Sequence, residues 1–133
     1  MEGKESSEPI GILAHQTCSD TLEYAKMLFM EKSFKKDYKK PRDIFLKMNG
    51  RKLYQYALEN VPQAIYNCLK KSNTPIEEMK KLLIHQANRK MDEAIIKKLY
   101  RLYGKREVPK YAMPMNISWM GNSSVATIRT LLD

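Results

Sequence analysis

The sequence predicts an α/β fold built on a mixed, mostly parallel sheet with flanking helices. Short apolar runs of strand length alternate with longer segments in which apolar residues recur every three or four positions. Polar clusters containing Gly, Asn or Pro separate these segments. The chain of 133 residues is 43% hydrophobic and 29% charged, a composition typical of a folded soluble domain rather than a disordered chain.

The first third of the chain predicts one strand and two loops. The polar residues 1–9 predict a flexible lead-in, and the apolar run Ile10–Ala14 predicts a buried strand. Residues 15–20 are polar and predict a loop. Residues 21–33 fit neither the helical nor the strand period. The lysine-rich segment Ser33–Arg42 predicts an exposed loop that ends beside a proline.

The middle third predicts a strand followed by a long helix. The segment Ile44–Met48 predicts a strand or an extended approach, which the Asn-Gly pair at 49–50 ends. An apolar stripe at three- and four-residue steps predicts a helix from Arg51 to about Ser72, which Pro62 should kink or split. The segment Thr74–Glu77 matches a capping box with proline in the first turn and predicts a short helix.

The last third predicts two further strand–helix units. The compact apolar run Leu82–Ile84 predicts a buried strand, and the stripe from Met91 to Leu102 predicts a helix that ends at Gly104. Residues 108–114 contain two prolines and predict a connector. The run Met115–Trp119 predicts another strand, followed by a tight turn at 121–124 and a helix that begins at Val125.

The net charge of +9 indicates an acidic partner, such as an acidic protein, a phosphorylated cofactor or a nucleic acid. The basic residues are scattered as pairs, however, which favours a solvated surface over one binding patch. No apolar run approaches the roughly 18 residues of a membrane span, and no signal sequence is recognised. Two cysteines suggest neither a disulfide framework nor a metal site, so we expect a cytoplasmic protein without metal or membrane contact.

Two polar residues stand where catalytic residues of α/β proteins commonly lie. His85 follows one predicted strand and Asn122 follows another, and each directly precedes a helix. Because ligands bind outside the carboxyl ends of such strands, we expect the two side chains to meet in one crevice. An imidazole and an amide NH₂ would form a two-donor site that stabilises an enolate or a tetrahedral oxyanion. Such a site needs a nucleophile from elsewhere.

Three motifs resemble those of β-ketoacyl-ACP synthase III. They are Ile-His-Gln-Ala-Asn at 84–88, Gly-Asn-Ser-Ser at 121–124, and the segment Lys-Met-Asn-Gly-Arg-Lys-Leu-Tyr-Gln-Tyr-Ala at 47–57. The resemblance covers residues 10–133. It implies the C-terminal half of a thiolase-like fold, truncated before the last strands.

The resemblance also implies a reaction. In this family a cysteine in the first half takes an acyl group from acyl-CoA. Malonyl-ACP then loses CO₂, and its enolate attacks the acyl-enzyme in the step that initiates fatty-acid synthesis. His85 and Asn122 would hydrogen-bond the malonyl thioester oxygen as the enolate forms. The implied partners are acyl carrier protein, acyl-CoA and the N-terminal half of the enzyme, which forms a homodimer at full length, and no cofactor is implied.

The resemblance carries substrate-binding roles to six further residues. Asn88 would lie along the pantetheine arm, with Arg89 and Lys90 contacting CoA and the carrier protein. Lys90 stands where the family usually has an arginine, and a lysine does not offer the same two-pronged phosphate contact. The residues expected to line the pantetheine tunnel are Met48, Gly50 and Tyr54.

The chain departs from the family in lacking the nucleophile. Cys18 does not match the position of the family's cysteine, and Asp20 nearby opposes thiolate formation. We therefore expect a partial C-terminal domain at 10–133 that is inactive alone. Two other interpretations remain open: a thiolase-fold relative with another acyl-CoA condensation, and a basic module that binds nucleic acid.

Overall fold

The computed structural model describes residues 11–132, so the predicted lead-in at 1–9 lies outside the described residues. Eight elements follow in the order helix, strand, strand and then helices only. They are α1 Thr21–Tyr24, β1 Leu28–Glu31, β2 Phe45–Met48, α2 Gly50–Lys71, α3 Arg89–Leu102, α4 Ile117–Met120, the 3₁₀ turn η1 Ser124–Ala126 and α5 Thr127–Thr130.

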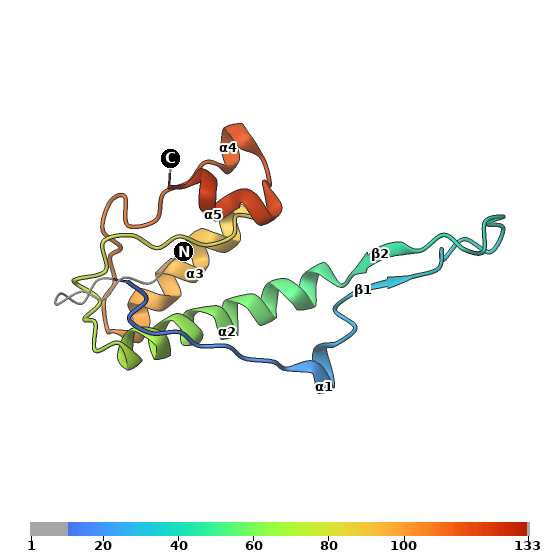
Figure 1. Ribbon diagram of the computed structural model, residues 1–133. Coiled ribbons are helices and arrows are strands. Elements are labelled where there is room, and N and C mark those ends of the chain that lie inside the picture. Colours follow the sequence, from blue (N-terminus) through green and yellow to red (C-terminus); the bar gives the residue numbers. More distant parts are fainter. Residues whose placement is uncertain (1–10, 133) are drawn as a thin grey trace.

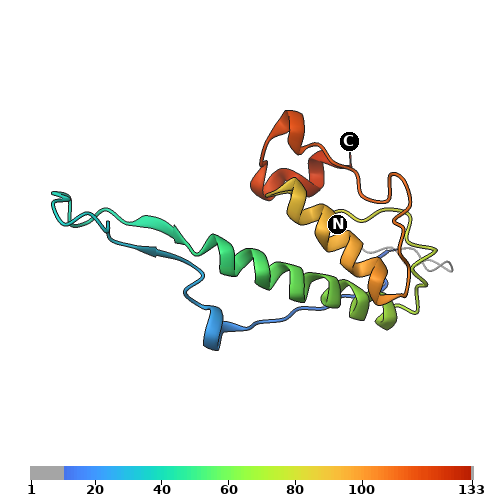
Figure 2. The ribbon, with the colours of Figure 1, turned by 180° about the vertical axis from the view of Figure 1, so that it is seen from behind.

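The molecule consists of a helical body and a long arm (Figures 1 and 2). The arm, residues 28–48, is an antiparallel hairpin in which Leu28 pairs with Met48 and Glu31 with Phe45. It continues the line of α2 away from the body. The expected exposed loop at 33–42 forms its tip. The predicted strand at 44–48 is confirmed as β2.

The core lies where α2 packs against α3. Its buried members include Leu82 from the segment before α3 and Leu99 and Tyr100 on α3, with Leu99 fully inaccessible. Half-buried residues of α2, among them Ile65 and Leu69, cover the same cluster. The apolar stripes that predicted the two long helices are therefore the faces that meet here, because burial of those stripes stabilises both helices.

Local capping groups fix the ends of both long helices. The Asn49 side chain accepts a hydrogen bond from the backbone N–H of Lys52, which starts α2. α2 continues through Pro62 without splitting. Proline removes one hydrogen bond from the helix, but the Pro62 ring is buried, and its packing offsets that loss. Gly104, at φ +72°, follows the end of α3 as expected.

Three predicted strands are wrong within the described residues, and so is one short helix. Residues 11–14 are irregular and largely exposed, and the segment Leu82–Ile84 pairs with no neighbouring strand. The only sheet among residues 11–132 is the antiparallel arm, so the mostly parallel sheet is not formed by these residues. A strand needs a neighbouring strand that forms a series of backbone hydrogen bonds with it. In the segment 82–84 the backbone N–H of Leu82 donates a single hydrogen bond, to the carbonyl of Ala112 at 2.7 Å.

The predicted strand Met115–Trp119 is instead the helical turn α4, and the predicted helix at 74–77 is a single turn. Short apolar runs suit either structure, and tertiary contacts decide between them. In the second segment Ile76 is drawn into the core, with only 2% of its surface exposed.

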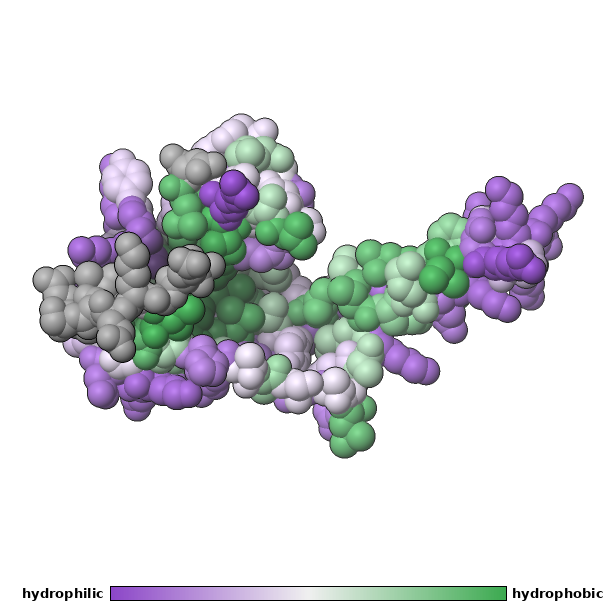
Figure 3. Space-filling model, in the orientation of Figure 1, coloured by the Kyte–Doolittle hydropathy of each residue, from purple (hydrophilic) through white to green (hydrophobic). Residues whose placement is uncertain are grey.

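Large apolar side chains remain exposed on two surfaces. Figure 3 shows the arm as apolar along its shaft and hydrophilic at its tip. The exposed shaft residues include Met30, Leu46 and Met48, and a second group near the end of the chain includes Trp119 and Val125. Exposed apolar surface of this kind commonly marks an interaction site.

Candidate functional site

The segment 85–88 joins the core to the start of α3. His85 is exposed, and its Nδ1 lies 3.1 Å from Oγ1 of Thr127, the first residue of α5. Thr127 itself is buried, with 1% of its surface exposed. This contact across 42 positions attaches the histidine to the C-terminal segment that carries Asn122.

Gln86 is the buried clamp between the same two segments. Its Oε1 accepts hydrogen bonds from the backbone N–H groups of Asn116 at 3.0 Å and Ile117 at 3.1 Å. Its Nε2 donates to the carbonyl of Pro114 at 2.8 Å. Because Ile117 begins α4, the Gln86 side chain caps the turn that leads to Asn122.

Asn122 lies in the exposed turn between α4 and η1. Its Oδ1 accepts a hydrogen bond from the backbone N–H of Ser124 at 2.9 Å. Gly121 before it adopts φ +67° and ψ −163°, a conformation that essentially only glycine adopts. With its oxygen engaged, the Asn122 amide presents its NH₂ group, the hydrogen-bond donor that an oxyanion requires.

A chain of hydrogen bonds connects the two motifs. His85 Nδ1 contacts Thr127 Oγ1, and Thr127 Oγ1 donates to the carbonyl of Ser124 at 2.9 Å. The N–H of Ser124 in turn donates to Asn122. The structure therefore brings His85 and Asn122 into one hydrogen-bonded unit through the side chain of Thr127 and the backbone of Ser124, and not through strand ends. Their catalytic roles stay a prediction.

Polar residues buried within the described structure gather around this unit. They are Gln86, Asp92, Asn116 and Thr127, all at most 4% exposed. Asn116 Nδ2 donates to the carbonyl of Thr130 at 3.1 Å and contacts the Thr130 hydroxyl at 3.0 Å, which ties α4 to α5. Such a network fixes the relative position of its parts more firmly than an apolar contact would.

Asp92, in the first turn of α3, is an unusual member of this cluster. It is fully buried, and neither carboxylate oxygen has a hydrogen-bond partner among the described residues. Burial raises the pKa of Asp92 to about 6, while the charge of His85 acts to lower it. A titratable group in a polar cluster beside a candidate catalytic histidine is typical of functional sites.

The residues expected to bind the carrier and pantetheine begin α3. Asn88 is its N-cap, and Asn88 Oδ1 accepts from the N–H groups of Lys90 at 3.0 Å and Met91 at 3.3 Å. Arg89 pairs with Glu93 at 2.9 Å on the surface. Lys90 is exposed. The structure thus shows a capping role for Asn88 and leaves the expected ligand roles untested.

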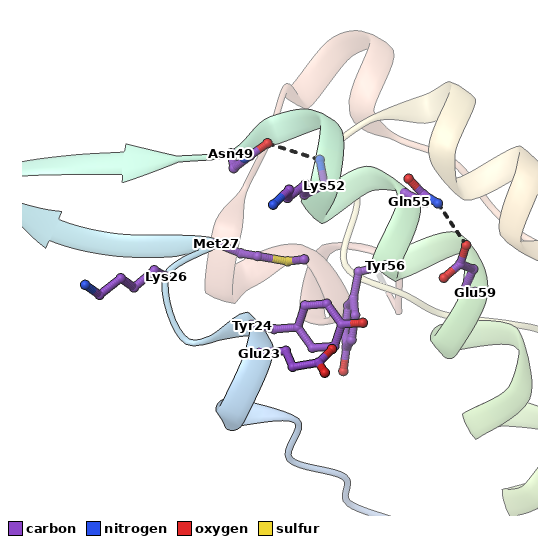
Figure 4. A pocket seen from close by; sticks show the side chains of 9 residues that line it. All are labelled: Glu23, Tyr24, Lys26, Met27, Asn49, Lys52, Gln55, Tyr56 and Glu59. Atoms are coloured by element: carbon purple, nitrogen blue, oxygen red, sulfur yellow. Dashed lines mark hydrogen bonds between the residues drawn. The ribbon is translucent and has the colours of Figure 1, made fainter.

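The expected tunnel residues Met48, Gly50 and Tyr54 lie at the junction of arm and α2. No hydrogen bond among residues 11–132 joins them to His85. Beside them, an open cleft of about 460 Å³ lies between α1 and α2 (Figure 4). The three residues do not line it, and neither do His85 and Asn122. Its lining residues are Glu23, Tyr24, Lys26, Met27, Asn49, Lys52, Gln55, Tyr56 and Glu59.

Two tyrosines shape this cleft. The rings of Tyr24 and Tyr56 lie 4.7 Å apart, as Figure 4 shows. The Tyr56 hydroxyl donates to the Asp20 carboxylate, and this hydrogen bond raises the pKa of Tyr56 to about 12. The Cys18 sulfur lies 3.7 Å from the same carboxylate. Neither Cys18 nor Cys68 lines the cleft.

No cluster of three or more histidine, cysteine, aspartate or glutamate side chains that could bind a metal occurs in residues 11–132. In the same range, no helix has both the length and the apolar character that crossing a bilayer requires.

Sequence reasoning missed Gln86, Asp92, Asn116 and Thr127. Gln86 stood within a recognised motif, so its position was visible but its clamping role was not. Asp92 belongs to a helix rich in charged residues, and nothing in the pattern distinguishes a buried carboxylate from a solvated one. Only tertiary structure identifies these residues.

Comparison with known proteins supports the resemblance. No protein-family model matches the chain. The β-ketoacyl-[acyl-carrier-protein] synthase III of Lactobacillus helveticus is 37% identical over 93 residues, which are 70% of this chain and 26% of that protein. The synthase III of Prochlorococcus marinus is 33% identical over 88 residues, covering 66% of this chain and 24% of that protein.

Solved structures of related synthases have a similar fold over the same residues. The 3-oxoacyl-(acyl carrier protein) synthase III of Pseudomonas aeruginosa matches 98% of this chain and 36% of its own length, with a TM-score of 0.75 at 20% identity. The 3-oxoacyl-(acyl-carrier protein) synthase of Burkholderia xenovorans matches 83% of this chain and 32% of its own, with a TM-score of 0.63 at 25% identity. The chain therefore has part of the thiolase-like α/β fold, as the sequence predicts.

The chain spans about a quarter of the length of the curated relatives it matches. Over that span it is homologous to β-ketoacyl-ACP synthase III.

Proposed function

We propose that this chain provides the oxyanion-stabilising residues of a 3-oxoacyl-ACP synthase III that condenses an acyl-CoA primer with malonyl-ACP. The observation that carries the proposal is the hydrogen-bonded unit of His85, Thr127, Ser124 and Asn122. It holds an imidazole and an amide NH₂ in one polar cluster on a chain homologous to that family.

In the proposed reaction, a cysteine outside these 133 residues takes the acyl group from acyl-CoA. The malonyl thioester loses CO₂, and its carbonyl oxygen gains negative charge as the enolate forms. His85 and Asn122 stabilise that oxygen. The enolate carbon then attacks the acyl-enzyme carbonyl, a carbon–carbon bond forms, and the cysteine leaves as thiolate. Fixed donors serve this step because they need no rearrangement as charge develops.

The start of α3 is suited to receive the phosphorylated end of the substrates. Lys90 is exposed there, and Arg89 lies beside it with part of its charge offset by Glu93. The N–H groups of Lys90 and Met91 are bonded to Asn88, so the attraction for an anion here comes from the positive end of the helix dipole and from the basic side chains. The acyl carrier protein is the proposed acidic partner. The phosphopantetheine belongs to the substrates, so the proposal includes no resident cofactor.

The proposal places the complete enzyme in the cytoplasm as a homodimer, with a cysteine-bearing half joined to this chain. Alone, this chain would not catalyse condensation. An extender other than malonyl-ACP would indicate the related alternative, a different acyl-CoA condensation on the same fold.

The test is to supply the cysteine-bearing half and measure two steps separately. His85→Ala and Asn122→Ala should each slow malonyl-ACP decarboxylation about 100- to 1000-fold, because each removes one oxyanion donor. Acylation of the cysteine by acyl-CoA should be largely unchanged.

Matched controls are His15→Ala and Asn67→Ala, because both residues are exposed and lie outside the polar cluster. These should change neither step. Loss of acylation with normal decarboxylation in the His85 and Asn122 variants would contradict the proposal.

A further inference from the structure

Positive charge is concentrated at the tip of the arm, residues 33–42. The tip has five basic residues and one acidic residue, Asp37. The basic residues are all exposed, and they are Lys35, Lys36, Lys39, Lys40 and Arg42. Figure 3 shows the tip as the hydrophilic end of an arm whose shaft is apolar. The ion pairs of residues 11–132, Arg89–Glu93 and Lys105–Glu77, lie on the body, so within that range the tip cations have no acidic partner.

Contacts with the neighbouring part of the hairpin hold the tip in place. The Tyr38 hydroxyl donates a hydrogen bond to the carboxylate of Asp43, and the Tyr38 ring meets the Phe45 ring edge-on at 5.2 Å. Nζ of Lys47 lies 3.6 Å from the centre of the Phe34 ring. These contacts engage the aromatic side chains and leave the five cations exposed. Because the tip is already ordered, a partner that binds these cations needs to order little of the backbone.

We propose that the tip of the arm is a docking surface for an acidic protein domain, the acyl carrier protein that brings the malonyl group. This inference rests on the proposed function. β2 leads from the tip directly to Met48 and Gly50, which the family motif places in the pantetheine tunnel. At about 3.3 Å per residue, Arg42 and Met48 are at most about 20 Å apart. A small domain is about 30 Å across, so a carrier seated on the tip also reaches the base of the arm.

The side chains of the tip favour an acidic protein over a nucleic acid. Four of the five cations are lysines, which pair as point charges with scattered carboxylates, whereas a two-pronged phosphate contact needs arginine. Single-stranded nucleic acids also stack their bases on free aromatic rings. Here the Tyr38 ring packs against Phe45, and Lys47 occupies one face of Phe34.

The experiment measures binding of fluorescently labelled acyl carrier protein, with its phosphopantetheine arm, to the chain joined to the cysteine-bearing half. Lys36→Glu/Lys39→Glu should weaken binding about tenfold at low salt, because each reversal replaces an attraction by a repulsion. Lys36→Gln/Lys39→Gln should lie between this variant and wild type. At about 1 M salt, where charges are screened beyond about 3 Å, all three proteins should bind alike. Both lysines are exposed, so the substitutions leave the fold intact.

The matched control is Lys80→Glu/Arg106→Glu, which changes the net charge equally at exposed positions on the body. It should change the affinity for the carrier by less than about twofold, because single exposed charges contribute little unless a partner contacts them. In steady-state assays, Lys36→Glu/Lys39→Glu should raise KM for malonyl-ACP. It should leave acylation by acyl-CoA unchanged, because that step involves no carrier protein.

Equal affinities of wild type and Lys36→Glu/Lys39→Glu, or equal losses in that variant and the control, would overturn the proposal. So would wild-type binding to a DNA duplex or to phosphatidylglycerol vesicles that is as tight as binding to the carrier. Failure of the proposed condensation would differ: the carrier would still bind with the same dependence on the tip, but wild type would not decarboxylate malonyl-ACP.

Discussion

Oε1 of Gln86 accepts the backbone N–H of Asn116 at 3.0 Å, and this bond joins the two motifs on which the proposed chemistry depends. The same oxygen accepts a hydrogen bond from the N–H of Ile117, and Nε2 donates one to the carbonyl of Pro114. One buried side chain thus satisfies three backbone groups of a segment that has no regular structure of its own until α4 begins. The position of Asn122 depends on that segment.

Gln86→Leu should therefore destabilise the fold strongly. It keeps the size of the side chain but leaves two N–H groups and one carbonyl without partners, at about 1–3 kcal/mol for each group that remains buried. We expect a loss of about 3 kcal/mol in unfolding free energy, measured by urea denaturation. The matched control is Gln63→Leu on the exposed face of α2, where the side chain bonds only to Asn67. Equal losses in the two variants would contradict the clamp.

Asp92 should make stability fall as pH rises. Its pKa is about 6 in the folded chain, against 3.8 in its ordinary range, because it is buried. Between about pH 4 and pH 6 the folded state holds more protons than the unfolded state, so unfolding free energy decreases with pH there. The difference between wild type and Asp92→Asn should shift by on the order of 3 kcal/mol in favour of the variant across this window.

Denaturant titrations of both proteins at several pH values measure this shift. In a His85→Gln background the fall should extend to higher pH, because the charge that lowers the pKa of Asp92 is gone. Asp37→Asn, in the exposed tip of the arm, is the control and should show a small difference at every pH. A wild-type minus Asp92→Asn difference that is flat with pH would show that the carboxyl is not buried as described.

Asn88 should be separable into a capping residue and a ligand residue. Asn88→Ala should cost about 1 kcal/mol of stability, because the N–H groups of Lys90 and Met91 lose their acceptor. Asn88→Ser keeps an acceptor and should restore stability to within a few tenths of a kcal/mol. Asn60→Ala, which removes an exposed side chain from α2, is the control.

A pantetheine contact would appear only in the assembled enzyme. There, Asn88→Ser would raise KM for malonyl-ACP while stability remained normal. If KM is unchanged in that variant, Asn88 serves as a cap and the ligand role expected from the family motif is wrong.

The two long helices could be predicted from the sequence because their apolar stripes are local signals. Their N-caps, Asn49 and Asn88, were not predicted as caps. The strands could not be predicted from the sequence, because a strand forms only where another strand pairs with its backbone. The segment 82–84 has no such neighbour among the described residues. The segment 115–119 was predicted as a strand because it is short and apolar, whereas Gln86, thirty positions away, caps its helical turn.

Part of the candidate site could likewise be predicted from the sequence, and part could not. His85 and Asn122 were recognisable because their motifs are contiguous in the sequence, and the resemblance supplied the expectation that they cooperate. The reason they lie in one unit was not recognisable, because Thr127 and Asp92 act through contacts made only in the folded chain. A threonine in a helix and an aspartate among lysines carry no sequence signal for burial.

Substitution by alanine should destabilise the chain at Gly121 but not at Gly50. Gly121 has φ +67° and ψ −163°, and a Cβ there would contact nothing within 4 Å, so the cost of Gly121→Ala is backbone strain alone, about 1–3 kcal/mol. The strain falls on the residue before Asn122, so decarboxylation in the assembled enzyme should decrease more than stability explains.

Gly50 begins α2 with an ordinary φ, and its Cβ would meet only the end of the Met48 side chain at 3.7 Å. Gly50→Ala should therefore leave stability unchanged or raise it by about 0.5–1 kcal/mol, since alanine loses less entropy in a helix. Its effect on KM tests whether pantetheine approaches the backbone at Gly50, as the family motif implies. Thermal unfolding of both variants gives the comparison, and a destabilised Gly50→Ala with a neutral Gly121→Ala would reverse the assignment of strain.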